Sequence, residues 1–155
     1  MLFLILGIVP VLILADMLMK NYVEDHYSFG EQHKICNDRV ILRKVHNRGM
    51  CMNAFEKYPD QVRIVSLVAA CFLTIYQLIC LVWQRKRYVK NTGLALMLAG
   101  AWSNTIDRCL RHHVVDYIGV ETKWKHLKRI TFNLGDLFIF LGAVFIWLSS
   151  FHRKK

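Results

Sequence analysis

The most regular feature of the chain is a set of four long apolar blocks separated by polar segments. The blocks cover about residues 1–19, 64–83, 90–107 and 134–151. Each approaches the ~20 residues that an α-helix needs to cross a ~30 Å hydrocarbon layer. Because a backbone in lipid must satisfy its own hydrogen bonds, we expect every block to be a helix. The pattern predicts an all-α membrane protein with four transmembrane helices in one membrane-embedded domain, residues 1–155.

Composition excludes a disordered chain and supports a folded membrane protein. Of the 155 residues, 55% are hydrophobic and only two are prolines. Such a chain is too apolar to remain unfolded in water. The first block has no Lys or Arg ahead of it, and no small-residue cleavage site follows it. We therefore expect a retained helix rather than a signal peptide.

The distribution of basic residues predicts the orientation in the membrane. Residues 84–92 contain four Lys or Arg and no acids, and residues 151–155 contain three and no acids. Lys and Arg concentrate in cytoplasmic segments, so we expect a multi-pass protein with both termini in the cytoplasm. The longer segments 20–63 and 108–133 would then lie outside. The net charge of +10 indicates this topology and contact with anionic membrane lipids, not a nucleic-acid partner.

The first outer segment contains a stretch that suggests a strand. Val40–Val45 (VILRKV) is rich in β-branched residues, although its alternation is poor. This run could supply a strand in the first outer segment. Cys36 and Cys51 share this segment, and whether they form a disulfide stays open.

Polar side chains concentrate at the outer ends of the apolar blocks. Ionisable groups are costly there and indicate function. All of them fall on the side that the charge distribution assigns to the exterior, although polar groups placed only for packing would face either side. The set comprises Asp16, Lys20, Asn104, Asp107, Arg108, Asp116, Asn133 and Asp136.

Carboxylates gathered in this way suit acid/base hydrolysis. Two carboxyl groups held close in a low dielectric cannot both ionise easily, so one keeps a proton. The ionised partner can activate water while the protonated one donates to a carbonyl, and Arg108 or the Asn residues can stabilise charge. Helix capping by the Asn and Asp residues is the alternative. For Asp16 and Lys20 the alternative is an ion pair at the membrane interface.

Five short motifs, taken together, resemble the lipoprotein signal peptidases (signal peptidase II), a family of intramembrane aspartyl proteases. The resemblance spans nearly the whole chain, and its strength lies in the order of the motifs. They are Asp16–Lys20 (DMLMK), His46–Gly49 (HNRG), Ser103–Arg108 (SNTIDR), Val114–Asp116 (VVD) and Phe132–Asp136 (FNLGD). The family fold implies a four-helix membrane bundle with a small extracytoplasmic β-cradle, so we expect a small β element between the first and second helices, to which Val40–Val45 would contribute a strand.

The resemblance also implies an activity and residue roles. Asp116 and Asp136 would form the catalytic dyad of an endopeptidase that uses water, without metal or cofactor. It would cleave the signal peptide from diacylglyceryl-modified prolipoproteins, just before the lipidated Cys, at the bacterial cytoplasmic membrane, and we expect a monomer. Residues that support the dyad or bind substrate would be Asn104, Arg108, Asn133, Asp107, Asn47, Gly49, Asp16 and Lys20.

The chain departs from the family pattern without losing an acid. Met19 stands for the usual Thr, Ser103 for Gly, and Gly135 for Ala. The family's Ala-Phe pair, usual just after the Asn-x-Gly stretch, occurs here only at Ala54–Phe55, so the register of the first outer loop stays open. The changes are compatible with altered substrate preference.

Other functions stay open at this point. One is an inactive paralogue that binds lipidated peptides in the membrane. A transporter is disfavoured, because the ionisable groups lie near one face. Zinc is disfavoured because the spacing of the outer-segment His and Cys fits no standard pattern. His112 and His113 are expected to be solvated loop residues.

Overall fold

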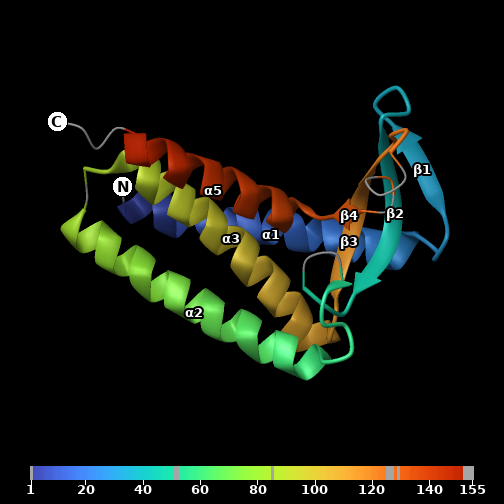
Figure 1. Ribbon diagram of the computed structural model, residues 1–155, viewed down its shortest axis with the longest axis horizontal. Helices are drawn as coiled ribbons and strands as arrows, with labels where there is room; N and C mark the ends of the chain where they lie inside the picture. The colour runs from blue at the N-terminus through green and yellow to red at the C-terminus, as the bar shows by residue number, and fades with distance from the viewer. Residues whose placement is uncertain (1, 51–52, 85, 125–127, 129, 152–155) are drawn as a thin grey trace.

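Four long helices lie side by side, and a small sheet covers one end of the bundle (Figure 1). The computed structural model describes residues 2–50, 53–84, 86–124, 128 and 130–151. The helices are α1 (Leu2–His26), α2 (Pro59–Trp83), α3 (Tyr88–Arg111) and α5 (Leu134–Phe151). The prediction of four helices is confirmed.

Helix α1 is longer than the apolar pattern predicted, because its burial continues past the apolar block. It runs on to His26 rather than ending near residue 19. Val23, in this extension, is fully buried and packs against Val115 and Tyr117. The end of α1 therefore belongs to the core beneath the sheet.

The sheet has four antiparallel strands in the order β1-β2-β3-β4. The expected strand at Val40–Val45 is confirmed and extends to Asn47. The expected β element between the first and second helices is confirmed as β1 and β2, and two further strands of the same sheet come from the segment between α3 and α5. The β-branched run after α3 forms β3, which pairs with the edge of β2. Without this partner, the backbone N–H and C=O groups on that edge would be unpaired. The strands are β1 (Gln32–Ile35), β2 (Val40–Asn47), β3 (Val114–Val120) and β4 (Thr131–Phe132).

Pairing of β2 with β3 brings two distant motifs together. Asn47 lies opposite Val114, and Val45 lies opposite Asp116. An irregularity in the ladder falls between Leu42 and Val45. The register therefore places Asn47 beside the strand that holds Asp116. Of the two outer-segment cysteines, Cys36 is exposed and Cys51 lies outside the described residues.

Helix α3 is central and packs against α1, α2 and α5. It contacts α5 most closely, at Gly93 against Gly142 and at Gly100 against Gly135. A Cβ added to Gly142 would lie 2.5 Å from the carbonyl oxygen of Gly93. Small residues are what allow two helix backbones to approach this closely.

Two of the described helices, α2 and α5, are long and apolar enough to cross a membrane by length and composition. The start of α1 and the end of α5 both lie at the bundle end away from the sheet (Figure 1). This arrangement agrees with the expectation that both termini lie on one side. The outer polar residues lie at the opposite, sheet-bearing end.

The glycine contact makes a prediction about stability. We expect Gly142→Ala to lower the free energy of unfolding by about 1–3 kcal/mol, because the new methyl group overpacks the α3–α5 interface. The melting temperature in detergent would then fall by about 2–10 °C. Gly7→Ala is the matched control, since a Cβ there meets no described atom within 4 Å. Equal melting temperatures for the two variants would contradict the close packing.

Candidate active site at the sheet end of the bundle

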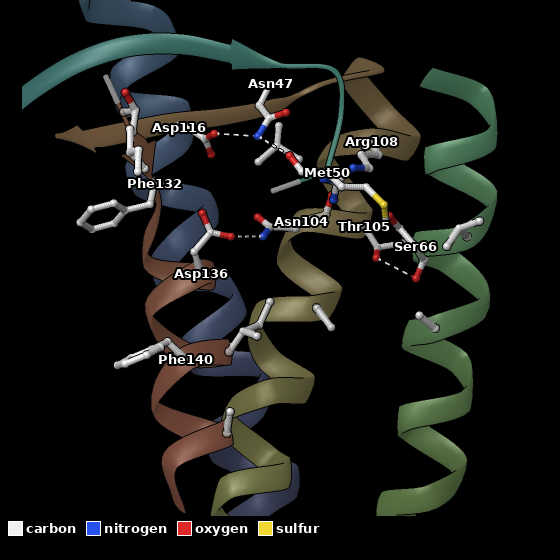
Figure 2. Close-up of a pocket in the computed structure, with 18 residues that line it drawn as sticks. Asn47, Met50, Ser66, Asn104, Thr105, Arg108, Asp116, Phe132, Asp136 and Phe140 are labelled. Atoms are coloured by element: carbon white, nitrogen blue, oxygen red, sulfur yellow. Dashed lines mark hydrogen bonds between the residues drawn. The ribbon is translucent and has the colours of Figure 1, made fainter. Parts of the chain in front are cut away.

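Asp116 and Asp136 line one cavity of about 590 Å³ beneath the sheet (Figure 2). Asp116 comes from the middle of β3, and Asp136 from the first turn of α5. The volume is within the usual range for ligand sites, about 300–1,000 Å³. The structure thus places the two predicted acids in the wall of the same cavity.

Asn133 and Asp136 form a reciprocal cap at the start of α5. The Asp136 backbone N–H donates to Asn133 Oδ1 at 2.9 Å, and the Asn133 backbone N–H donates to Asp136 Oδ2 at 3.2 Å. This is capping-box geometry, so the capping hypothesis is confirmed for this pair. Capping uses only one side-chain atom of each residue. Asn133 Nδ2 donates to Asp116 Oδ1 at 2.7 Å, so the cap also links the two acids.

Three Asn side chains point their N–H groups at the two acids. Asn104 Nδ2 donates to Asp136 Oδ1 at 2.9 Å, and Asn47 Nδ2 donates to Asp116 Oδ2 at 3.1 Å. Asn133 is the third. Each carboxylate therefore receives two N–H donors, one of them from Asn133 in both cases.

A donor on each Oδ1 fixes the orientation of these carboxamides. Asn104 Oδ1 accepts from Lys20 Nζ at 2.8 Å, and Asn47 Oδ1 accepts from the Gly49 backbone N–H at 3.0 Å. Lys and backbone N–H groups only donate. The Nδ2 atoms must therefore face the acids, and a flipped amide would lose both contacts.

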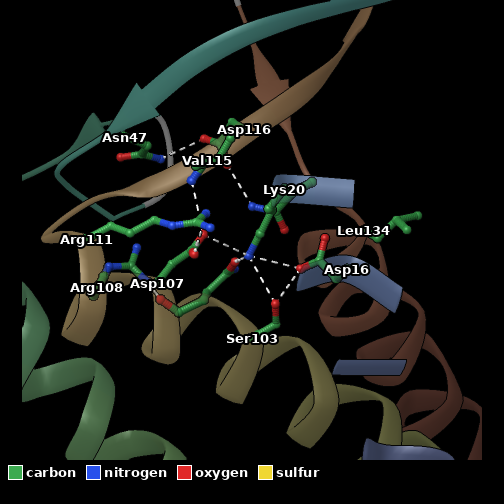
Figure 3. A network of polar contacts seen from close by, with 12 residues as sticks. Asp16, Lys20, Asn47, Ser103, Asp107, Arg108, Arg111, Val115, Asp116 and Leu134 are labelled. Carbon is green, nitrogen blue, oxygen red and sulfur yellow. Dashed lines mark hydrogen bonds and ion pairs between the residues drawn. The ribbon is translucent and has the colours of Figure 1, made fainter. Parts of the chain in front are cut away.

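Lys20 is the centre of a buried polar network (Figure 3). Its Nζ lies 2.9 Å from Asp16 Oδ2 and 3.3 Å from Asp107 Oδ2, and all three side chains are fully buried. Nζ also donates to Ser103 Oγ at 3.1 Å. The predicted ion pair between Asp16 and Lys20 is therefore confirmed. It lies inside the protein, where it joins α1 to α3.

Sequence reasoning missed two members of this network, Ser103 and Tyr117. Ser103 Oγ donates to Asp16 Oδ2 at 2.6 Å, so the residue that departs from the family pattern completes the network. Its position one turn before Asp107 on a helix was the available signal. Tyr117 donates to Asp16 Oδ1 at 3.0 Å and accepts from the Leu134 backbone N–H at 3.2 Å. Burial and the charge of Asp16 raise the pKa of Tyr117, so the hydroxyl stays a donor.

Asp107 supports the strand rather than the cavity. Its Oδ2 accepts from the Val115 backbone N–H at 3.1 Å, and its Oδ1 accepts from Arg111 at 3.1 Å. The first bond fixes β3 next to Asp116. The supporting role that the resemblance implied for Asp107 stays a prediction.

Arg108 lines the cavity and ties the first outer loop to α3. Its Nη2 donates to the Gly49 carbonyl at 2.9 Å, and its Nη1 donates to the Asn104 carbonyl at 3.3 Å. Its Nε has no hydrogen-bond partner among the described residues. Gly49 has no room for a side chain, because a Cβ would overlap the backbone of Asn53 and Ala54.

The environment of Asp116 favours its protonated form. The residue is only 3% exposed. Burial and the neighbouring charge of Asp136 raise the pKa of Asp116 to about 7, against the opposing hydrogen bonds from Asn47 and Asn133. At neutral pH a large fraction of Asp116 therefore holds a proton beside a second carboxyl group.

The cavity continues from the acids into an apolar space between the helices. Phe140 lies along α5 away from Asp136, on the side remote from the sheet (Figure 2). Most of the side chains that line this part of the cavity are small or aliphatic. The apolar lining consists mainly of Val65, Ala69, Ala101, Ile139, Phe140 and Ala143.

The fold is similar to that of solved membrane enzymes. One solved bacterial membrane enzyme matches with a TM-score of 0.82 and 18% identity, over 97% of this chain and 91% of that chain. A second matches with a TM-score of 0.78 and 16% identity, over 97% of this chain and 94% of that chain. The chain thus shares the fold of these structures, a bundle of long helices with a small sheet over one end.

Sequence comparison identifies the family. The model of the signal peptidase (SPase) II family matches residues 8–152, so the chain belongs to that family of proteases. The lipoprotein signal peptidase of Fusobacterium nucleatum is 28% identical over 147 residues, covering 94% of this chain and 86% of that protein. The lipoprotein signal peptidase of Shewanella sp. (strain MR-4) is 31% identical over 153 residues, covering 96% and 86%. The predicted resemblance is confirmed.

The buried network makes a second prediction. Asp16→Asn removes one of two anions that balance Lys20, and we expect a loss of about 3–5 kcal/mol in the free energy of unfolding. Asp60→Asn is the matched control, because Asp60 pairs with Arg63 at an exposed site, where ion pairs contribute little. Thermal unfolding in detergent measures both. A melting temperature for Asp16→Asn equal to that of the control would show that the network does not stabilise the fold.

Proposed function

We propose that this protein is a membrane-embedded aspartyl endopeptidase that removes the signal peptide from diacylglyceryl-modified prolipoproteins, just before the lipidated Cys. Membership of the signal peptidase II family supports the reaction, and the lipoprotein signal peptidases among its relatives support the substrate. One observation carries the mechanism. Asp116 and Asp136 share a cavity in which Asn133 hydrogen-bonds both carboxyl groups.

The two acids have different environments and therefore different roles. Asp136 lies in the first turn of α5 and accepts two N–H donors, and a helix N-terminus favours an anion. Asp136 is the ionised base. Asp116 is more deeply buried in β3, and its raised pKa keeps it protonated. Asp116 is the general acid.

The reaction follows from these roles. Asp136 takes a proton from water as the water oxygen attacks the scissile carbonyl carbon, and Asp116 gives its proton to the carbonyl oxygen. The tetrahedral intermediate collapses when Asp136 passes its proton to the leaving nitrogen and Asp116 recovers a proton from a hydroxyl group. The products are the carboxyl end of the signal peptide and the amino group of the lipidated Cys. Arg108, at the cavity wall, positions the peptide backbone.

The shape and lining of the cavity support a lipidated peptide as the substrate. Its polar end holds the two acids, and its apolar part runs between α2, α3 and α5. An acyl chain gains free energy from burial at about 0.8 kcal/mol per CH₂. The lipid therefore holds the scissile bond beside the acids, and unmodified precursors bind weakly.

The membrane arrangement that fits this chemistry has all four helices as spans. Both termini lie in the cytoplasm, and the sheet lies at the outer surface. Helices α2 and α5 are the most apolar, and α1 and α3 carry the buried polar network at their outer ends. In this arrangement the enzyme acts as a monomer surrounded by membrane lipids.

Conversion of the base to an amide tests the mechanism. We expect Asp136→Asn to slow cleavage of a diacylglyceryl-modified precursor at least ~10³-fold, because the water loses its proton acceptor. A gel-shift assay in detergent measures cleavage, and copurification of the uncleaved precursor measures binding. Asp60→Asn should cleave at the wild-type rate. Cleavage by Asp136→Asn near the wild-type rate excludes the dyad, and binding without cleavage by the wild type indicates a binding paralogue.

The raised pKa of Asp116 predicts a pH dependence. Above pH 7 Asp116 loses the proton that it must donate, so kcat/KM should fall about tenfold per pH unit. Stability changes in the same direction, because the folded form binds this proton more tightly than the unfolded form. The contribution of Asp116 to the free energy of unfolding is fully present below about pH 4 and is lost as the pH rises through about 7. Between pH 5 and pH 8, the melting temperature of Asp116→Asn should fall less than that of the wild type, because the variant lacks this titrating carboxyl group. A flat rate profile up to pH 9 would contradict the assignment.

A further inference from the structure

A second polar cluster lies at the sheet end, apart from the two acids. Glu24 near the end of α1, His46 in β2 and His113 before β3 each place one carboxylate or imidazole atom within 4.8 Å of the others. They come from three separate segments of the chain. The signal peptide reaction described above uses none of them.

His113 is held in an unusual state for a surface histidine. Its Nε2 is buried and has no hydrogen-bond partner among the described residues. The expectation that His113 is a solvated loop residue is therefore wrong, whereas its neighbour His112 is exposed. A buried polar atom without a partner is costly and needs an explanation.

The arrangement of His113 is that of a metal ligand. Its Nε2, which is buried and has no hydrogen-bond partner among the described residues, is free to bind a metal ion. The His113 ring stacks on that of His46, with centroids 3.7 Å apart. His46 Nε2 in turn lies 2.8 Å from Glu24 Oε2. All three donor groups thus adjoin one another before any metal is bound.

We propose that Glu24, His46 and His113 form a binding site for a divalent transition metal, with zinc as the best match. Two imidazoles and one carboxylate are a ligand set that suits Zn²⁺ and leaves a fourth position for water. The metal takes the place of the proton between His46 and Glu24, and the stacked rings tilt so that their lone pairs converge. The site is structural rather than catalytic for peptide cleavage.

One charge at the site opposes the metal. Lys44 Nζ lies 3.9 Å from Glu24 Oε1 and donates to the Glu24 backbone carbonyl at 2.9 Å. Oε2, the atom that faces His46, remains available. Removal of the Lys44 charge should therefore strengthen metal binding. This gives the test a variant whose metal affinity is expected to rise, beside variants in which it is expected to be lost.

Two members of the cluster lie close in sequence to two residues of the candidate active site, so a bound metal would affect how these residues are held. His46 directly precedes Asn47, and His113 lies three residues before Asp116. Glu24 belongs to α1, which lies under the sheet (Figure 1). A bound metal would clamp the paired strands that carry Asn47 and Asp116 to helix α1.

Zinc content tests the proposal without reference to activity. The full chain, purified in detergent with its affinity tag removed, is dialysed against micromolar ZnCl₂, and bound zinc is measured by mass spectrometry. We expect about one zinc per wild-type chain and a zinc-dependent rise in melting temperature. Both should be lost in Glu24→Gln and His113→Gln. His112→Gln, at the exposed neighbour, is the matched control and should bind like the wild type.

Lys44→Met provides an independent readout in a competition titration with a zinc chelator. Its zinc affinity should rise several-fold over the wild type, since a positive charge leaves the site. Zinc bound equally by Glu24→Gln and wild type, or no zinc in the wild type, would overturn the proposal. If His113→Gln does not fold, Glu24→Gln and Lys44→Met decide the question. Neither outcome alters the test of Asp136, so the two proposals fail separately.

Discussion

The buried ammonium group of Lys20 is the constraint on which the rest of the site depends. A lone charge in this environment costs several kcal/mol, and it is tolerated only when opposite charges and acceptors surround it. Asp16 and Asp107 supply the two anions, and Ser103 and Asn104 supply oxygens. These groups come from α1 and α3. The two helices can therefore pack in one register only, because any slip leaves charges unpaired in the core.

The same network orients the surroundings of Asp136 and Asp116 without contacting most of their carboxylate atoms directly. Lys20 fixes the carboxamide of Asn104, which then donates to Asp136. Asp107 holds the backbone of β3 next to Asp116. Charge balance in the core and orientation of the acids are thus parts of one hydrogen-bonded system. The close glycine contact between α3 and α5 completes it, because it brings Asn104 within reach of the first turn of α5.

The sheet and the bundle have complementary tasks. The bundle supplies the apolar part of the cavity, and the sheet closes its polar end with Asn47 and Asp116. A cavity that is apolar along its length and polar at one end favours a substrate built in the same way. The Glu24, His46 and His113 cluster lies where sheet and bundle meet, so a metal there would act on the junction that carries half of the acid pair.

The sequence by itself determined the helices and the family, and it named most of the polar residues that the structure gathers at the sheet end. Blocks of about twenty apolar residues specify helices because the backbone has no other partner in lipid, and the five motifs mark Asp116 and Asp136 by their order. The extent of α1, the strands after α3, the Asp16–Tyr117 contact and the orientation of each Asn were decided only by the tertiary structure. Local patterns report which face of a segment is apolar. Whether Lys20 is buried or His113 meets Glu24 depends on residues tens of positions away, whose proximity arises only when the chain packs.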